Sequence, residues 1–529
     1  MFRRLAVTLV ACALAAPAAE ASRFEVSART MASLYQLPVV RLFGGDLSLS
    51  RRRFRQDVAV TIWDLGDLAA TRRRARPGAP DDGPVVWFTG ALHLDHDFGA
   101  WTMGELTVGD DRVDALDTIP ELGAEAVALV VPYGYLAVDG LGGRVDLRLG
   151  RTMRFDDLGA NGLDGLTALV HTGAPVAVGV EVGLRVRDRS PLAWGGADLD
   201  GTTGADCREY VEAATPGAGS WQIIDRSRVP RGDALAAAAD CPERAQWQPT
   251  LALAIAADGL DWLDGRLEYR RTQSRTVGVI GLVDRLDFPD RGLYPNEAGQ
   301  APAWGTNDEA VAATARLRRG GRTAIEPWAY ARYSLVQAAL ERAGAGARVT
   351  RGAHALEPEV ARAVPRFDAD SIWSVFAIAP SLDARLSYAY RRRGGAVSAG
   401  AVAWLRRYDD GAELAGGGSA RAELGLARTR LAGELFWDDG YGGRRAGGAI
   451  AAGWQSSRAL RWGGRGAVVA VGDAGPRATG TTVSAAGSTT WQIDRGIALI
   501  ATADVATGPR DPFALRTLAV LDLAFEPDR

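Results

Sequence analysis

Hydrophobic and polar residues alternate with a period of two along most of the chain. From Leu382 to Arg391, every second residue is Leu, Ala, Leu, Tyr and Tyr, whereas the residues between them are Asp, Arg, Ser, Ala and Arg. The segments 144–151, 178–187 and 263–270 show the same pattern. A period of two is that of a β-strand, so each segment predicts a strand with one apolar and one charged face.

Segments of this kind recur along the chain at a length of about ten residues, which a tilted strand needs to cross a bilayer. Glycine-rich turns such as 140–143 and 393–395 alternate with longer loops, the longest near 194–248 and 277–307. Because a bilayer tolerates no open sheet edge, such strands close into a barrel. We therefore predict an all-β fold, a single large antiparallel transmembrane β-barrel of about 16–22 strands. One of the two longest loops is expected to fold inward as a constriction.

The first residues predict export. Arg3 and Arg4 precede the apolar run Leu5–Ala16, and Ala19-Glu20-Ala21 forms a small-x-small cleavage site. This organisation is typical of a cleaved signal peptide covering residues 1–21, which leaves 22–529 as the barrel domain. The mature chain then retains Cys207 and Cys241, a candidate disulfide within the loop near 194–248. Two free thiols are the alternative.

Composition narrows the classes of function. The 529 residues include 61 basic and 64 acidic residues, a net charge of −3, so no nucleic-acid partner is expected. None of the basic residues is Lys, and a coding bias toward Arg explains part of this. No apolar run after the signal peptide reaches about 18 residues, which excludes a helical membrane protein. The balanced charges predict a mixed pore lining of paired Arg and Asp or Glu.

The charged strand faces supply candidate pore-lining residues. Arg51, Arg53 and Arg55 share one face, and guanidinium groups in a confined pore attract anions. The alternatives to a pore-lining role for these three arginines are a basic rim of the barrel and the coding bias toward Arg. The remaining candidates are Arg144, Asp146, Arg148, Glu181, Arg185, Arg266, Glu268, Asp383 and Arg385.

The sequence contains little that supports catalysis or metal binding. His93, Asp95 and Asp97 share a strand face and could hold an ion, although a polar strand end is the favoured interpretation. Nucleophile motifs such as GxSxG and phosphate-binding glycine loops in a strand-to-helix context are absent from the sequence. We therefore predict neither catalysis nor a cofactor.

Aromatic residues near the ends of the predicted strands are interpreted as interfacial girdles, with ordinary strand packing as the alternative. They are Trp87, Phe88, Trp101, Tyr133, Tyr135, Trp328, Tyr330, Trp404, Tyr408, Phe436, Trp437 and Trp491.

Three regions resemble outer-membrane proteins of Gram-negative bacteria. The final run, with Ala519, Leu521, Leu523 and Phe525 on one face, resembles the closing strand that the barrel-assembly machinery reads, apart from a polar extension after Phe525. Residues 135–151, followed by Asn161–Leu166, resemble a hairpin of large porins. Ser50–Phe54 with Asp95–Gly99 is similar to the opening strands of phosphate-selective and related porins.

The resemblance implies a porin-like barrel in the bacterial outer membrane. Such a protein contacts outer-membrane lipid, passes small polar or anionic solutes by passive diffusion, and can form a homotrimer. The absence of Lys does not fit phosphate selectivity. The alternatives are a barrel with a plugged lumen that acts as an enzyme or surface-structural protein, and a secreted soluble β protein, for which the expected repeat of about 40–50 residues is missing.

Overall fold

The structure, a computed structural model, describes most of the chain outside its longest connections. The described residues are 23–39, 47–63, 65, 84–97, 106–108, 111–113, 127–186, 208–212, 221–225, 248–277, 303–321, 323–364, 380–392, 394–409, 414–440, 443–472, 479–509 and 513–525. Within these ranges, no helix has the length and apolar character needed to cross a membrane. The predicted signal peptide, Cys207 and Cys241 lie outside the described residues, so the cleavage site and the disulfide stay predictions.

One 22-stranded sheet forms the body of the molecule. Its strands are β1 (Arg23–Val39), β2 (Leu47–Trp63), β3 (Val85–Asp97), β6 (Val127–Leu141), β7 (Val145–Asp156), β8 (Gly159–His171), β9 (Val176–Val186), β12 (Pro249–Ala257), β13 (Leu263–Val277), β14 (Ala303–Leu317), β15 (Thr323–Ser334), β16 (Ala339–Arg351), β17 (His354–Ala363), β18 (Ser381–Arg391), β19 (Val397–Tyr408), β20 (Leu414–Gly425), β21 (Thr429–Asp439), β22 (Arg444–Gln455), β23 (Leu460–Gly472), β24 (Gly480–Asp494), β25 (Ile497–Thr507) and β26 (Ala514–Phe525). Two separate hairpins pair β4 (Leu106–Val108) with β5 (Asp111–Val113) and β10 (Arg208–Glu212) with β11 (Trp221–Asp225).

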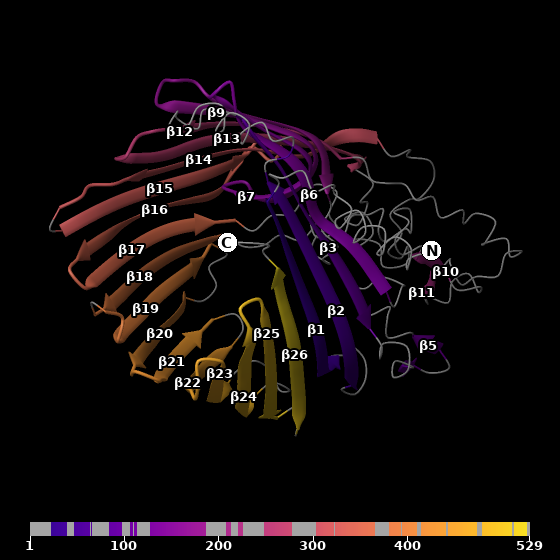
Figure 1. The fold of residues 1–529 in the computed structure, drawn as a ribbon, viewed down its shortest axis with the longest axis vertical. Coiled ribbons are helices and arrows are strands. Elements are labelled where there is room, and N and C mark those ends of the chain that lie inside the picture. Colours follow the sequence, from indigo (N-terminus) through magenta and orange to yellow (C-terminus); the bar gives the residue numbers. More distant parts are fainter. Residues whose placement is uncertain are drawn as a thin grey trace, which may run out of the picture.

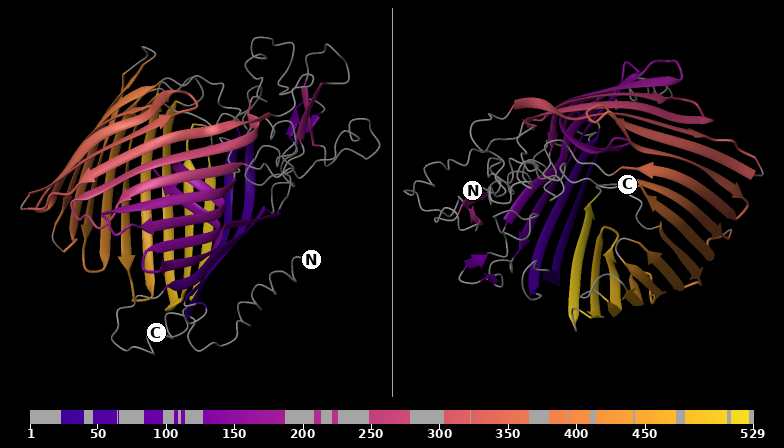
Figure 2. Two further views of the ribbon diagram at one scale, coloured as in Figure 1. Left: turned by 90° about the horizontal axis from the view of Figure 1, so that it is seen from above. Right: turned by 180° about the vertical axis from the view of Figure 1, so that it is seen from behind.

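The sheet closes on itself. Each strand pairs antiparallel with its neighbours, and β26 pairs with β1 in a register that places Phe525 opposite Val26 and Thr517 opposite Leu34. Figure 1 shows the resulting ring with β26 beside β1, and the right view of Figure 2 shows the yellow C-terminal strands beside the indigo N-terminal strands from behind. Closure leaves no free edge at the join between the first and last strands, as a barrel in lipid requires. The prediction of a single all-β barrel is confirmed, and its strand number lies at the upper end of the predicted range.

The two ends of the barrel differ. Strand β1 begins and β26 ends at the same end, here called the turn end, where short turns such as Gly140–Arg144 and Thr172–Pro175 join neighbouring strands. The connections β3–β6, β9–β12 and β13–β14 lie at the opposite end, here called the loop end. This asymmetry is typical of outer-membrane barrels, whose turns are short on the periplasmic side.

The apolar strand faces point outward, as predicted. Leu382 and Leu386 on β18 are 45% and 47% exposed, and Val182 on β9 is 50% exposed. Glu181, which precedes Val182 and lies on the opposite face, is only 4% exposed. In water such exposed apolar side chains would be unfavourable, whereas in a bilayer they meet hydrocarbon.

Only some of the aromatic residues on the outer face are those predicted to form the interfacial girdle. Trp454, Trp462 and Trp491 lie on the outer face near the turn end, with 53%, 46% and 48% exposed, and Phe525 lies nearby. Of these four, the sequence analysis chose only Trp491 for a girdle.

Several other predicted girdle residues lie on the lumenal face instead, so that interpretation is wrong for them. They include Trp87, Tyr135, Trp328, Tyr330, Trp404 and Phe436. A glycine on the adjacent strand leaves room for the ring in several cases, as Gly417 does for Trp404 and Gly447 for Phe436.

Candidate pore constriction

The β7–β8 hairpin leaves the barrel wall toward the loop end. Pairing between β6 and β7 stops at Gly134 opposite Arg151, although β7 continues to Asp156. Pairing between β8 and β9 begins only at Gly162 opposite Val186. The hairpin tip, residues 152–161, therefore pairs almost entirely with itself, and Figure 1 shows β7 inside the ring of strands.

Three glycines in register permit this inward bend. Gly150 lies opposite Gly165, and Gly165 lies opposite Gly183. A Cβ on Gly150 would lie 2.3 Å from the carbonyl oxygen of Gly134, and one on Gly165 would lie 2.1 Å from that of Val182. Gly150 also has a φ of +133°, which side chains of L-residues rarely tolerate. The bend therefore needs glycine at these positions.

Gly150→Ala is expected to destabilise the barrel by about 1–3 kcal/mol, because the added methyl group meets a backbone oxygen at a strained φ. The measurement is the urea midpoint of folding into lipid vesicles. Gly487→Ala on β24 is the matched control, since a Cβ there meets no atom within 4 Å. Equal midpoints for the two variants would contradict the assignment of Gly150 as a steric requirement of the bend.

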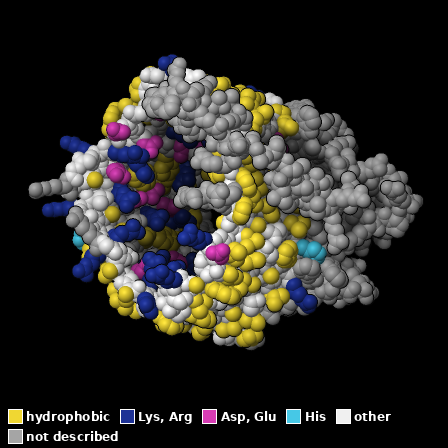
Figure 3. Space-filling model, in the orientation of Figure 1, with side chains coloured by type: hydrophobic (Ala, Val, Ile, Leu, Met, Phe, Trp, Pro, Cys, Tyr) yellow, Lys and Arg dark blue, Asp and Glu magenta, His cyan; other side chains and the backbone are white. Residues whose placement is uncertain are grey.

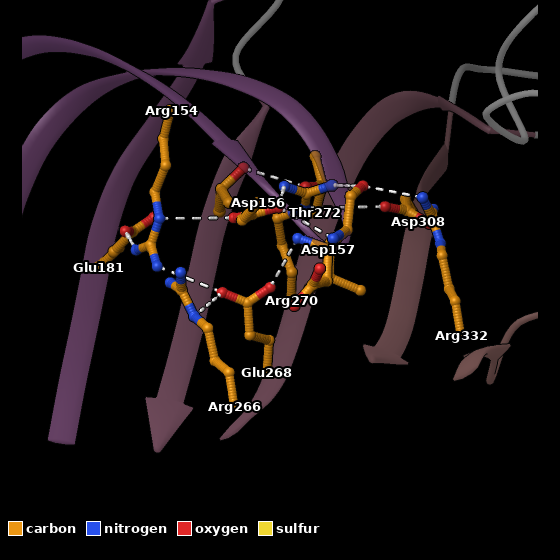
Figure 4. Close-up of polar contacts among 12 residues, drawn as sticks. Arg154, Asp156, Asp157, Glu181, Arg266, Glu268, Arg270, Thr272, Asp308 and Arg332 are labelled. Atoms are coloured by element: carbon orange, nitrogen blue, oxygen red, sulfur yellow. Dashed lines mark hydrogen bonds and ion pairs between the residues drawn. The ribbon is translucent and has the colours of Figure 1, made fainter. Parts of the chain in front are cut away.

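The tip is anchored to the inner wall by ion pairs. The Arg154 guanidinium contacts the carboxylate of Glu181 on β9, and its Nη2 lies 3.2 Å from Oε1 of Glu268 on β13. Glu268 also contacts Arg266 and accepts a 3.1 Å hydrogen bond from the backbone N–H of Asp157 (Figure 4). Glu268 therefore binds both a side chain and the backbone of the hairpin.

Backbone and apolar contacts complete the anchor. The carbonyl oxygen of Leu158 accepts hydrogen bonds from Arg270 Nη2 at 2.5 Å and Arg332 Nη1 at 2.8 Å. The Leu158 side chain is 3% exposed and packs with Ala310 and Ala312 of β14, whose small side chains leave it room. The tip thus spans the inner surface from β9 to β15.

Burial makes these charges dependent on one another. Glu181, Glu268 and Arg270 are 4%, 3% and 5% exposed, and Arg270 Nη1 lies 3.6 Å from Asp156 Oδ1. A buried charge that loses its partner costs about 3–5 kcal/mol. We conclude that the tip is held as a fixed second layer inside the barrel.

The lumenal wall from β16 to β23 is rich in arginine. Arg385 and Arg465 are exposed on this wall, and neither forms an ion pair with another described residue. Arg406 binds Asp383 through two bonds of 2.6 and 2.8 Å. Figure 3 shows a hollow in the barrel with basic side chains, all of them arginine in this chain, gathered on its left wall, where Figure 1 places β15–β20. The wall thus offers free positive charge to a solute.

The arginines from the start of the chain occupy a different, neutralised region. Arg53 binds Asp95 through bonds of 2.7, 3.0 and 2.5 Å. Arg55 binds Asp57 at 3.0 Å and contacts His93 Nδ1 at 2.8 Å. These residues lie on the lumenal face of β2 and β3, where the cationic groups are balanced by carboxylates. The side chains of Arg51 and Asp97 lie outside the described residues.

The remaining candidates lie in several places. Glu181, Arg266 and Glu268 belong to the hairpin anchor, whereas Asp383 and Arg385 belong to the arginine-rich wall. Near the turn end, Arg148 lies over the Tyr135 ring, 5.8 Å from its centroid, and Asp146 accepts a hydrogen bond from the Gly140 N–H and lies 3.3 Å from His171. Arg144 lies in the β6–β7 turn, and the backbone N–H of Arg185 donates to Gln248.

No metal centre is found in the described part of the chain. There, no group of three or more His, Cys, Asp or Glu side chains is arranged to hold an ion. His93 instead contacts Asp57 at 3.0 Å and lies 3.8 Å from Asp95, within the set of ion pairs on β2 and β3.

Sequence reasoning missed the hairpin tip. Apart from the short pair β10–β11, the long loops expected to constrict the pore lie almost wholly outside the described residues. Arg154, Asp157, Leu158, Arg270 and Arg332 were not candidates. The alternating segment 144–151, which identified the faces of this strand, ends before Arg154. It gave no sign that the strand would leave the wall.

Comparisons with known proteins identify no sequence relative. No protein-family description and no curated protein matches the sequence. Among solved structures, Pseudomonas aeruginosa OccK7 (OpdD) aligns with 96% of this chain and 99% of its own at 7% identity and a TM-score of 0.40. Acinetobacter baumannii OccAB4 aligns with 95% of this chain and 98% of its own, at 6% identity and a TM-score of 0.38. The P pilus usher (PapC) translocation pore aligns with 94% of this chain and 99% of its own, at 7% identity and a TM-score of 0.41. Because all three TM-scores are below 0.5, we base the function on the residues of this chain.

Proposed function

We propose that this chain is an outer-membrane channel for the passive diffusion of small polar or anionic solutes. The observation that supports this most strongly is the division of the barrel into an apolar outer face and a charged lumenal wall, on which Arg385 and Arg465 form no ion pair with another described residue. A bilayer favours the first, and hydrated anions favour the second.

The anchored hairpin supports a size limit for the solutes. Its tip lies across the inner wall from β9 to β15 and is fixed by Arg154, Glu268 and Leu158. A structure that narrows a water-filled lumen sets the largest solute that passes, whereas lining charges set the preferred sign. Interaction with the barrel-assembly machinery through the strand ending at Phe525, and assembly into a homotrimer, are further parts of this proposal.

Solute entry into proteoliposomes tests the function. Vesicles that contain the folded protein are expected to swell in isosmotic solutions of small sugars and small organic anions, and to swell less as solute size increases. Vesicles with heat-unfolded protein are the control. If solutes of every size leave the folded-protein vesicles unswollen, the lumen is plugged and the channel proposal fails.

A further inference from the structure

The hairpin tip has a second face, opposite the anchored one. Arg154 of β7 lies on the anchored face, as do Asn161 and Leu163 of β8, which are 3% and 2% exposed. Met153 and Phe155 occupy the alternate positions of β7 and are 53% and 76% exposed. Because the anchored face packs on the inner wall of β9–β15, the other face is directed away from that wall, toward the open lumen.

Small neighbours leave the Phe155 ring accessible. Phe155 lies opposite Ala160 and Met153 lies opposite Gly162 across the hairpin. Gly162 has no side chain, and Phe155 is 76% exposed. An aromatic ring that remains exposed inside a water-filled pore is an apolar surface that a passing solute can cover favourably.

The lumen therefore presents two different surfaces to a solute. The hairpin contributes an apolar face with Phe155 and Met153, whereas the wall from β16 to β23 contributes Arg385 and Arg465, which form no ion pair among the described residues. A solute that satisfies both surfaces carries an anionic group and an apolar body.

We propose that Phe155 is a specificity-determining residue that favours amphipathic organic monoanions over equally charged polar ones. The inference rests on the proposed channel function and deepens it. The guanidinium groups of the wall attract the anionic group of the solute into the lumen, and the apolar part of the solute covers the Phe155 ring as it passes the hairpin. The preference among anions then depends on Phe155, whereas the preference for anions over cations depends on the arginines.

Bi-ionic reversal potentials in planar bilayers test this with two monoanions of similar size, cyclohexanecarboxylate and gluconate. In wild-type protein the permeability ratio is expected to favour cyclohexanecarboxylate. Phe155→Ser is expected to lower that ratio by at least about threefold, since an apolar contact of this size discriminates at that level. Phe155→Leu, which keeps an apolar side chain, is expected to retain most of the ratio.

Phe513→Ser is the matched control, because Phe513 is 62% exposed but lies before β26, outside the hairpin. Chloride conductance and heat-modifiable migration verify that each variant forms a folded channel. An unchanged ratio in conducting Phe155→Ser channels overturns the inference and leaves the channel function intact. Absence of conductance in the wild-type protein would instead overturn the proposed function.

Discussion

Replacing Glu181 and Glu268 together with Ala is expected to release the β7–β8 tip and to raise single-channel conductance by at least about twofold. Both carboxylates contact Arg154, and Glu268 also accepts the backbone N–H of Asp157. Without them, the acidic partner left to Arg154 is Asp156 of its own hairpin, at 3.6 Å, so the ion pairs that tie its guanidinium group to the barrel wall are lost. The desolvation of that group is then less well compensated, at a cost of up to about 3–5 kcal/mol. Moving the tip into the water of the lumen removes that cost, and it widens the path along β9–β15. Recordings in planar bilayers measure the change.

Glu359→Ala is the control for this double variant. Glu359 is also a lumenal carboxylate, but it accepts a 3.3 Å hydrogen bond from Tyr330 and has no contact with the hairpin in the described structure. Its conductance is expected to remain close to that of the wild type. A folded double variant with wild-type conductance would show that the two glutamates do not hold the constriction.

Reversing the charge of Arg385 and Arg465 is expected to lower the ratio of anion to cation permeability by at least about fivefold. Both side chains are exposed on the lumenal wall without an ion pair among the described residues, so their charge acts directly on ions in the pore. The double variant Arg385→Glu with Arg465→Glu converts two attractive groups into repulsive ones for anions. Reversal potentials in a potassium chloride gradient give the ratio.

Arg407→Glu provides the comparison for these reversals. Arg407 is exposed on the outer face of β19, opposite Leu382 and Leu414, so its charge lies outside the lumen. Its reversal potential is expected to match that of the wild type. If the Arg385 and Arg465 double variant keeps the wild-type ratio in folded channels, ion selectivity arises elsewhere in the pore.

The barrel was predictable because lipid and water impose opposite demands on the two faces of a strand. Glu181 and Asp383 cannot face hydrocarbon, so they face the lumen. The apolar residues that precede and follow them in the strand then face the lipid, and this fixes the orientation of β9 and β18. Aromatic residues carry no such constraint. Trp404 and Trp491 are both near strand ends, yet Trp404 lies in the lumen and Trp491 faces outward.

The inward hairpin was not predictable from the same pattern. Residues 152–156 resume the alternation of β7 in the same phase after Gly150 and Arg151. The bend depends on Gly150, Gly165 and Gly183 lying in register on three strands. That register becomes visible only when the strands are paired. The anchor likewise joins Arg154 to Glu268, residues far apart in sequence, so no local motif reveals it.

Single-channel recording of the purified, folded protein in a planar bilayer tests whether the barrel encloses a water-filled pore lined by arginine. We expect discrete conductance steps with higher permeability for chloride than for potassium. A correctly folded barrel that inserts into the bilayer and produces no steps, or whose steps favour potassium, would contradict it.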